Sequence, residues 1–172
     1  MVTKRLRGPN VLVLGTPGTG KSTLCKRILE KTNVNHINVS QLISEKKLYK
    51  EWDDEFECSI YDEDLLLDEL ETFDFESGGF LVEFHSCDIF SDNLFDNIIV
   101  LRTDIETLSK RLEERNYTNE KIDENLQSEI FQVVLDDAND VFDKNKVVQF
   151  QSNTMKEMET VVDYAISLFQ AQ

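Results

Sequence analysis

Short runs of consecutive apolar residues alternate along the chain with longer segments in which apolar residues recur every three or four positions. The runs are typical of buried strands, and the wider spacing is typical of helices that pack one face against a core. Strands are predicted at 11–14, 36–39, 80–84, 98–101 and 147–150. Helices are predicted at about 20–31, 40–48, 62–73, 104–115, 119–143 and 156–169. This alternation predicts an α/β fold in which helices flank a five-stranded parallel sheet.

Two of the predicted helices have features that the structure can test directly. Ser40 is the expected N-cap of the helix that begins there, because a side-chain hydroxyl accepts hydrogen bonds from the first turn. In the long helix over 119–143, one apolar face is expected to pack against the core. Its members are Ile122, Leu126, Ile130, Val133, Val134 and Val141.

Length and composition predict a single domain over residues 1–172. Hydrophobic residues make up 40% and charged residues 30%. Because no apolar run approaches about 18 residues, no membrane span is expected. Nor does an apolar segment of the signal-peptide type precede the first strand, so we expect an intracellular protein. Cys25, Cys58 and Cys87 match no metal-ligand spacing, and we interpret them as reduced thiols without a special role.

The charge of the chain is strongly negative. Lys and Arg total 18 against 34 Asp and Glu, which gives −16. Such a field repels phosphate at long range, so broad binding to nucleic acid is not expected. Residues 51–76 include 13 acidic residues and no Lys, Arg or His. This acidic stretch is either a solvated face or a docking surface for a cationic partner.

The sequence GTPGTGKST at 15–23 has the G-x-x-x-x-G-K-[ST] spacing of a phosphate-binding loop. It lies between a predicted strand and a predicted helix, where backbone N–H groups and the helix N-terminus attract phosphate oxygens. Lys21 is expected to contact the transferred phosphates, and the Ser22 hydroxyl to bind Mg²⁺. The residues expected to hold ATP here are Gly15, Gly18, Thr19, Gly20, Lys21, Ser22 and Thr23. The alternative is a glycine-rich turn that binds nothing.

Other candidate residues follow the predicted strands, where open parallel sheets bind their ligands. Glu83 ends the third strand and is expected to hold Mg²⁺ opposite Ser22. His85 lies two residues later on the same side of the extended chain, and is either a catalytic group or a structural one. His36 begins a strand and is interpreted as structural. Ser152 and Asn153, after the last strand, are expected to contact the nucleotide.

Arg111 and Arg115 lie four residues apart, on one face of a predicted helix that ends at 116–117. A cationic pair at such a position can close over a triphosphate and stabilise charge during phosphoryl transfer. Both are therefore candidate catalytic residues, and Arg115 is also a candidate ATP contact. The alternative is surface pairing with neighbouring acids.

These motifs together resemble the atypical adenylate kinase family, the adenylate kinase isoenzyme 6 or coilin-interacting nuclear ATPase group. The similarity covers almost the whole chain in order. Its motifs are GTPGTGKS at 15–22, INV at 37–39, YDED at 61–64, FHSCD at 84–88, VLRTD at 100–104, RLEER at 111–115 and EIFQV at 129–133.

The resemblance implies a P-loop fold of the nucleoside-monophosphate-kinase type. It implies a monophosphate-binding region at about 38–62 and a short lid at about 114–124. The implied activities are phosphoryl transfer from ATP to AMP or related monophosphates, and ATP hydrolysis. The family is nuclear and cytoplasmic and assists cleavage of small-subunit pre-rRNA by engaging a ribosomal protein. A basic ribosomal protein suits the negative charge of this chain.

The chain departs from the family pattern on the acceptor side. Glu83 replaces the usual Asp, Ser44 replaces an arginine, and residues 91–93 replace a Pro-Glu-Arg run. Asn116 replaces a glycine at the lid hinge. Lost arginines predict weak binding of the acceptor phosphate, unless Lys46, Lys47 or Arg102 compensates. An AMP kinase with ATPase activity is therefore weighed against a nucleotide-switched assembly factor and a non-catalytic nucleotide-binding module.

Overall fold

The computed structural model describes residues 7–53 and 58–171 and contains a central parallel sheet of five strands. In spatial order the strands are β2 (Asn35–Asn38), β5 (Phe80–Glu83), β1 (Val11–Leu14), β6 (Asn97–Arg102) and β7 (Val147–Gln151). Every neighbouring pair in this sheet is parallel. The predicted five-stranded parallel sheet is confirmed.

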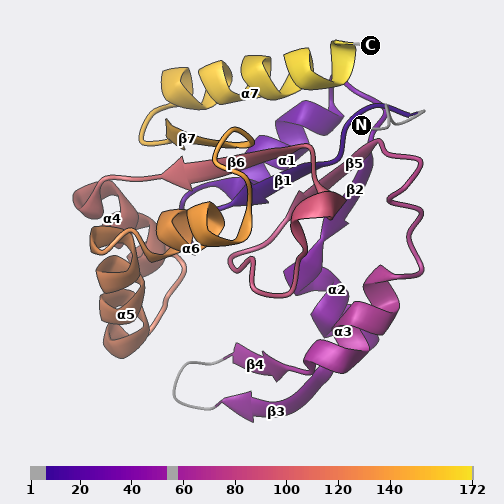
Figure 1. Cartoon of the computed structure of the whole chain (residues 1–172). Helices are drawn as coiled ribbons and strands as arrows, with labels where there is room; N and C mark the ends of the chain where they lie inside the picture. The colour runs from indigo at the N-terminus through magenta and orange to yellow at the C-terminus, as the bar shows by residue number, and fades with distance from the viewer. Residues whose placement is uncertain (1–6, 54–57, 172) are drawn as a thin grey trace.

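Helices cover both faces of the sheet (Figure 1). They are α1 (Lys21–Leu29), α2 (Val39–Lys46), α3 (Glu63–Leu70), α4 (Ile105–Glu114), α5 (Asn119–Ile130), α6 (Val133–Val141) and α7 (Met155–Gln170), with a 3-10 turn, η1, at Asp92–Leu94. Within the part of the chain that the structure describes, no helix combines the length and apolar character needed to cross a bilayer.

Alternate side chains of the central strand β1 divide between two cores, as the strand period of two requires. Val11 and Val13 pack with α1 and α7 on one face. Leu12 and Leu14 belong to the core on the opposite face, with residues of α2, α3 and α6. The strand therefore has no solvent-facing side, and the loop that follows it begins at the centre of the sheet.

An antiparallel hairpin of β3 (Tyr49–Asp53) and β4 (Cys58–Tyr61) lies beyond α2 and α3, away from the main sheet (Figure 1). The sequence pattern did not predict it, because acidic residues conceal any apolar alternation in this stretch. Residues 54–57, including Phe56 of the acidic stretch, lie outside the described residues.

The predicted bounds of α2 were wrong at both ends. Its N-cap is Asn38, whose Oδ1 accepts a hydrogen bond of 2.9 Å from the backbone N–H of Gln41. Ser40 lies inside the helix. The helix ends at Lys46 because Lys47 adopts a left-handed conformation with φ 55°, and Leu48 lies beyond it.

The helix predicted over 119–143 is two helices, α5 and α6. Gln132 adopts φ 57° between them, which ends α5 and turns the chain. Ile130, Phe131 and Val133 are exposed at this turn. The single continuous apolar face that the spacing predicted is therefore wrong at Ile130 and Val133.

Candidate active site

The phosphate-binding loop connects the end of β1 to the start of α1. Gly18 has φ +95°, and a Cβ there would lie 2.8 Å from a methyl carbon of Leu108. Glycine therefore allows both the turn and the close approach of α4. Thr19 closes the loop by donating its hydroxyl to the carbonyl of Thr16 at 2.8 Å. The loop is thus packed and hydrogen-bonded from within.

Lys21, the first residue of α1, turns back over this loop. Its Nζ donates to the carbonyls of Gly15 at 2.7 Å and Thr16 at 3.2 Å. Desolvation lowers the pKa of Lys21 to about 8, although the negative charge of Glu83 opposes the shift. An anion placed beside the ammonium group would raise this pKa again and favour the charged form, which is the environment that a nucleotide phosphate supplies.

Ser22 and Glu83 meet at the carboxyl end of the sheet, as the sequence led us to expect. The Ser22 hydroxyl donates to Oε2 of Glu83 at 2.7 Å. On the other side of the same carboxylate, Nε2 of His36 lies 3.0 Å from Oε1. Burial raises the pKa of Glu83, but these two hydrogen bonds, together with the charges of His36 and Lys21, outweigh burial and hold it below its usual value. Serine and carboxylate oxygens are hard donors of the kind that Mg²⁺ prefers.

His36 is the residue here that sequence reasoning assigned only a structural role. It is the second residue of the edge strand β2, and nothing in its local spacing indicates a contact with Glu83, which is 47 positions away. Parallel pairing of β2 with β5 brings the two together.

Two cavities meet at the phosphate-binding loop. The larger has a volume of about 590 Å³ and the smaller about 450 Å³. Gly18, Gly20 and Arg115 line both. The larger cavity is also bounded by Lys21, Ser22, Asn38, Ser40, Glu83, His85 and Lys121. The smaller is also bounded by Thr23, Arg111, Ser152, Asn153 and Met158. One loop therefore separates two compartments, and Arg115 faces each.

His85 lies on the wall of the larger cavity, with its ring centroid 4.3 Å from that of Phe84. Desolvation by the cavity wall, followed by the charge of Lys21, lowers the pKa of His85 to about 4, although part of the side chain still faces solvent. At neutral pH the imidazole is therefore uncharged and can accept a hydrogen bond.

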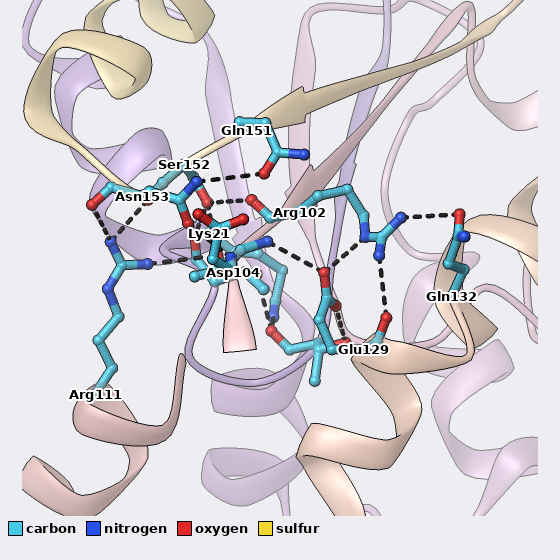
Figure 2. Close-up of polar contacts among 12 residues, drawn as sticks. Lys21, Arg102, Asp104, Arg111, Glu129, Gln132, Gln151, Ser152 and Asn153 are labelled. Carbon is cyan, nitrogen blue, oxygen red and sulfur yellow. Dashed lines mark hydrogen bonds and ion pairs between the residues drawn. The ribbon is translucent and has the colours of Figure 1, made fainter. Parts of the chain in front are cut away.

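Arg111 is committed to the turn between β7 and α7, as Figure 2 shows. Its guanidinium donates to the carbonyls of Ser152 at 2.7 Å and Asn153 at 3.2 Å. It also reaches the carbonyl of Gly18 at 3.3 Å. Arg111 thus braces two walls of the smaller cavity, whereas Arg115, one helical turn later, is exposed.

Ser152 and Asn153 have different positions in this turn. Ser152 is buried, and its hydroxyl donates to the carbonyl of Thr19 at 2.6 Å. Its side chain therefore holds the phosphate-binding loop in place through a hydrogen bond to the loop backbone. Asn153 is partly exposed, and its Oδ1 accepts from the backbone N–H of Asp104 at 2.7 Å.

Glu129 is a buried acid for which the motif EIFQV at 129–133 predicted no role. Its carboxylate accepts from the Thr16 hydroxyl at 2.7 Å, from Nε of Arg102 at 2.6 Å and from the Thr103 N–H at 3.1 Å (Figure 2). The side chain is 3% exposed. Its position gives a sequence clue, because Glu129 lies three residues after Leu126 on the apolar face of α5.

On the proposed acceptor side, two of the three cations expected to compensate for missing arginines are engaged elsewhere. Arg102 donates to Glu129 and Gln132 (Figure 2). Lys46 pairs with Glu69 at 3.4 Å. Within the described chain, the cations that line the larger cavity are Lys21, Arg115 and Lys121, and α2 contributes none.

Comparison with known proteins agrees with this arrangement. The sequence profile of the family described as "AAA domain" matches residues 11–132. The protein named adenylate kinase isoenzyme 6 homolog from Dictyostelium discoideum is 46% identical over 151 residues, which covers 88% of this chain and 86% of that protein. The homolog from Caenorhabditis elegans is 41% identical, covering 89% and 85%. The homolog FAP7 from Saccharomyces cerevisiae is 37% identical, covering 95% and 83%.

Solved structures show the same fold in more distant proteins. A shikimate kinase from Bacteroides thetaiotaomicron superposes with a TM-score of 0.60 at 18% identity, over 94% of this chain and 98% of that one. A gluconokinase from Sinorhizobium meliloti gives 0.59 at 16% identity, over 97% and 94%. At such identities the likeness concerns the fold, which is that of P-loop kinases.

Proposed function

Because this chain belongs to the adenylate kinase isoenzyme 6 family, we propose that it transfers the γ-phosphoryl group of ATP to AMP or a related nucleoside monophosphate, and that it also hydrolyses ATP. The observation that supports this most strongly is the arrangement of two cavities around one phosphate-binding loop. Such an arrangement suits a donor nucleotide on one side and an acceptor on the other.

The donor is assigned to the smaller cavity and the loop. Backbone N–H groups of the loop and the N-terminus of α1 attract phosphate oxygens. Lys21 then supplies a charge beside the transferred phosphate, and Arg115 can approach it from the wall that the cavities share. Arg111 keeps the turn at Ser152 and Asn153 in place beneath the nucleoside.

The Ser22 hydroxyl and the Glu83 carboxylate would hold Mg²⁺, since both are oxygen donors and lie in hydrogen-bond contact. When bound, the ion neutralises charge that develops on the phosphates. His85, neutral and on the acceptor wall, is proposed to orient an attacking water by accepting a hydrogen bond from it, or a phosphate oxygen by donating its ring N–H.

AMP is proposed to bind weakly, and ATP hydrolysis to continue without it. The support is the acceptor wall, where α2 offers Ser40 to the cavity and no cation within the described residues. Each charge-assisted hydrogen bond to a phosphate contributes about 1.5–3 kcal/mol, so the loss of two raises KM roughly 100-fold or more.

A second function, favoured by the same weak acceptor wall, is that of an assembly factor switched by ATP binding and hydrolysis. The proposed partner is a basic protein of the small ribosomal subunit, attracted by the net charge of −16 and the acids of residues 51–76. In this scheme the protein works in subunit maturation, in the nucleus and cytoplasm, and AMP phosphorylation is incidental.

One assay distinguishes the two functions. ADP formation from ATP would be measured with and without AMP, over a range of AMP concentrations. A kinase gives a rate that rises with AMP and saturates at high concentration. A rate independent of AMP at every concentration would contradict the kinase and favour the switched assembly factor.

A further inference from the structure

Cys25, His36 and Glu83 form a cluster of three different metal-ligating groups behind the phosphate-binding loop. Cys25 is on α1, His36 on the edge strand β2 and Glu83 at the end of β5. Their ligand atoms all lie within 4.8 Å of one another. The three residues are far apart in the sequence, so their spacing does not indicate a metal site.

The pairing of β2 with β5 explains why two of these side chains meet. His36 is the register partner of Leu81, and Asn38 is the partner of Glu83. Side chains two residues apart in a strand lie on the same face, so His36 and Glu83 are diagonal neighbours on the face that also contains Leu81. Leu81 packs in the core that includes α1 and Cys25. The thiol is therefore directed at the same point from the helix above.

We propose that Cys25, His36 and Glu83 bind a zinc ion, at a site that adjoins the one formed by Ser22 and Glu83 and shares the Glu83 carboxylate with it. Thiolate sulfur, imidazole nitrogen and carboxylate oxygen are the three ligand types that zinc takes in proteins, whereas Mg²⁺ takes oxygen. Tetrahedral zinc places its ligand atoms about 3.5 Å apart, so small side-chain rotations suffice.

The Glu83 carboxylate separates the two sites because its oxygens face in different directions. Oε2 accepts from Ser22, and Oε1 faces His36. Zinc would replace the contact between His36 and Oε1 and leave Oε2 on the side of Ser22. Occupation of one site thus alters the charge available to the other.

Two of the three ligands are buried away from water, and the third is partly exposed. Cys25 is 0% exposed, and the side chains of Glu83 and His36 are 4% and 26% exposed. The His36 side is thus the route for an ion, and water can complete the coordination there. Desolvation and the charge of Glu83 raise the pKa of Cys25, while Lys21 opposes them. A coordinating dication removes the thiol proton, so burial does not prevent binding.

The test uses Co²⁺ as a spectroscopic substitute for zinc, titrated into the full chain without nucleotide. We expect a thiolate-to-cobalt charge-transfer band and the visible absorption of tetrahedral cobalt, both lost when Zn²⁺ is added. Cys25→Ala should abolish the charge-transfer band. His36→Phe should lower the affinity for Co²⁺ by at least about tenfold, since even outer partners of a metal site contribute 10–100-fold.

Cys87→Ala and Cys58→Ala are the matched controls, because Cys87 is buried on the other face of the sheet and Cys58 is on the hairpin. Both should keep the band. If Cys25→Ala does not fold, Cys25→Ser gives the same test. Absence of the band in the wild-type chain, or its persistence without the Cys25 thiol, would overturn the proposal. Because no ATP is used, the result is independent of the proposed kinase activity.

Discussion

The donor side and the acceptor side of this site are built in different ways. Around the phosphate-binding loop, polar side chains from α4, α5 and the turn before α7 bond to side chains and carbonyls of the loop, as Glu129 does with the Thr16 hydroxyl and Ser152 with the Thr19 carbonyl. Around α2 and the hairpin, ion pairs such as Lys46–Glu69 and Lys50–Asp62 lie at the surface. A preorganised site loses little freedom when it binds, whereas an exposed one must first be ordered.

For the proposed function, this difference predicts that ATP recognition is built into the fold and that acceptor recognition is adjustable. Two changes should disrupt the donor side, one should disrupt the acceptor wall, and one should strengthen the acceptor side.

Glu129→Ala should have the largest effect. It leaves the guanidinium of Arg102 and the hydroxyl of Thr16 without their shared buried acceptor, and loss of one partner from a buried ion pair costs about 3–5 kcal/mol. The free energy of unfolding, measured by denaturant titration, should fall by about that amount. Asp123→Ala, an exposed acid on the same helix, should change it by less than about 0.5 kcal/mol. Equal effects of the two changes would refute the bracing role of Glu129.

Lys21→Ala should reduce both ATP hydrolysis and phosphoryl transfer by about 10²–10³-fold, the usual effect of losing one preorganised charge in a transition state. The fold should survive, because among the described residues the hydrogen bonds of the ammonium group go to two loop carbonyls and not to the core. Circular dichroism and steady-state turnover test this together. Lys26→Ala, an exposed change in the same helix, should leave turnover intact. Normal turnover by a folded Lys21→Ala protein would contradict the assignment of residues 15–23 as a phosphate-binding loop.

His85→Gly should lower ATP turnover by about 100-fold, the usual penalty for misplacing a reacting group, and change ATP affinity little. The pH profile gives a second readout. Because the pKa of His85 is lowered to about 4, the neutral form is retained as pH falls and is lost only near that value. An unshifted histidine would titrate near pH 6.5. If ATP affinity and turnover fell together, or if neither fell, a purely structural role of His85 would be favoured.

Ser44→Arg should have the smallest effect and is the change that strengthens the acceptor side. Ser44 lies one turn after Ser40, which lines the larger cavity, so an arginine there can extend toward it. The KM for AMP should fall about tenfold, the lower end of what one charged hydrogen bond provides. ATP hydrolysis without AMP should stay nearly constant.

Glu45→Gln is the matched control for this last change, because it raises the net charge by the same amount at the adjacent exposed residue, about 100° around α2. It should leave the KM for AMP unchanged. A low-micromolar KM in the wild-type chain would contradict the weak acceptor site altogether.

The sequence predicted the structure best where a single regular spacing of residue types dominates a segment. Apolar runs predicted all five sheet strands, and the spacing of Gly15 to Ser22 predicted the loop between β1 and α1. It was least informative where contacts come from distant residues. The contact of His36 with Glu83 depends on strand pairing, and the break at Gln132 depends on a backbone angle that no spacing indicates. In the acidic stretch, the many acidic residues likewise concealed the apolar alternation from which the hairpin could have been predicted.

The contacts around the loop also set the order in which the molecule becomes functional during synthesis. Ser152 supports Thr19 across 133 positions, and Glu129 holds Thr16 across 113. Contacts this far apart form slowly, because the intervening chain must be ordered first. A growing chain that has passed its glycine-rich loop has therefore not yet made a nucleotide site. Nucleotide affinity is therefore expected only once the last strand and the turn after it are in place, late in the synthesis of the chain.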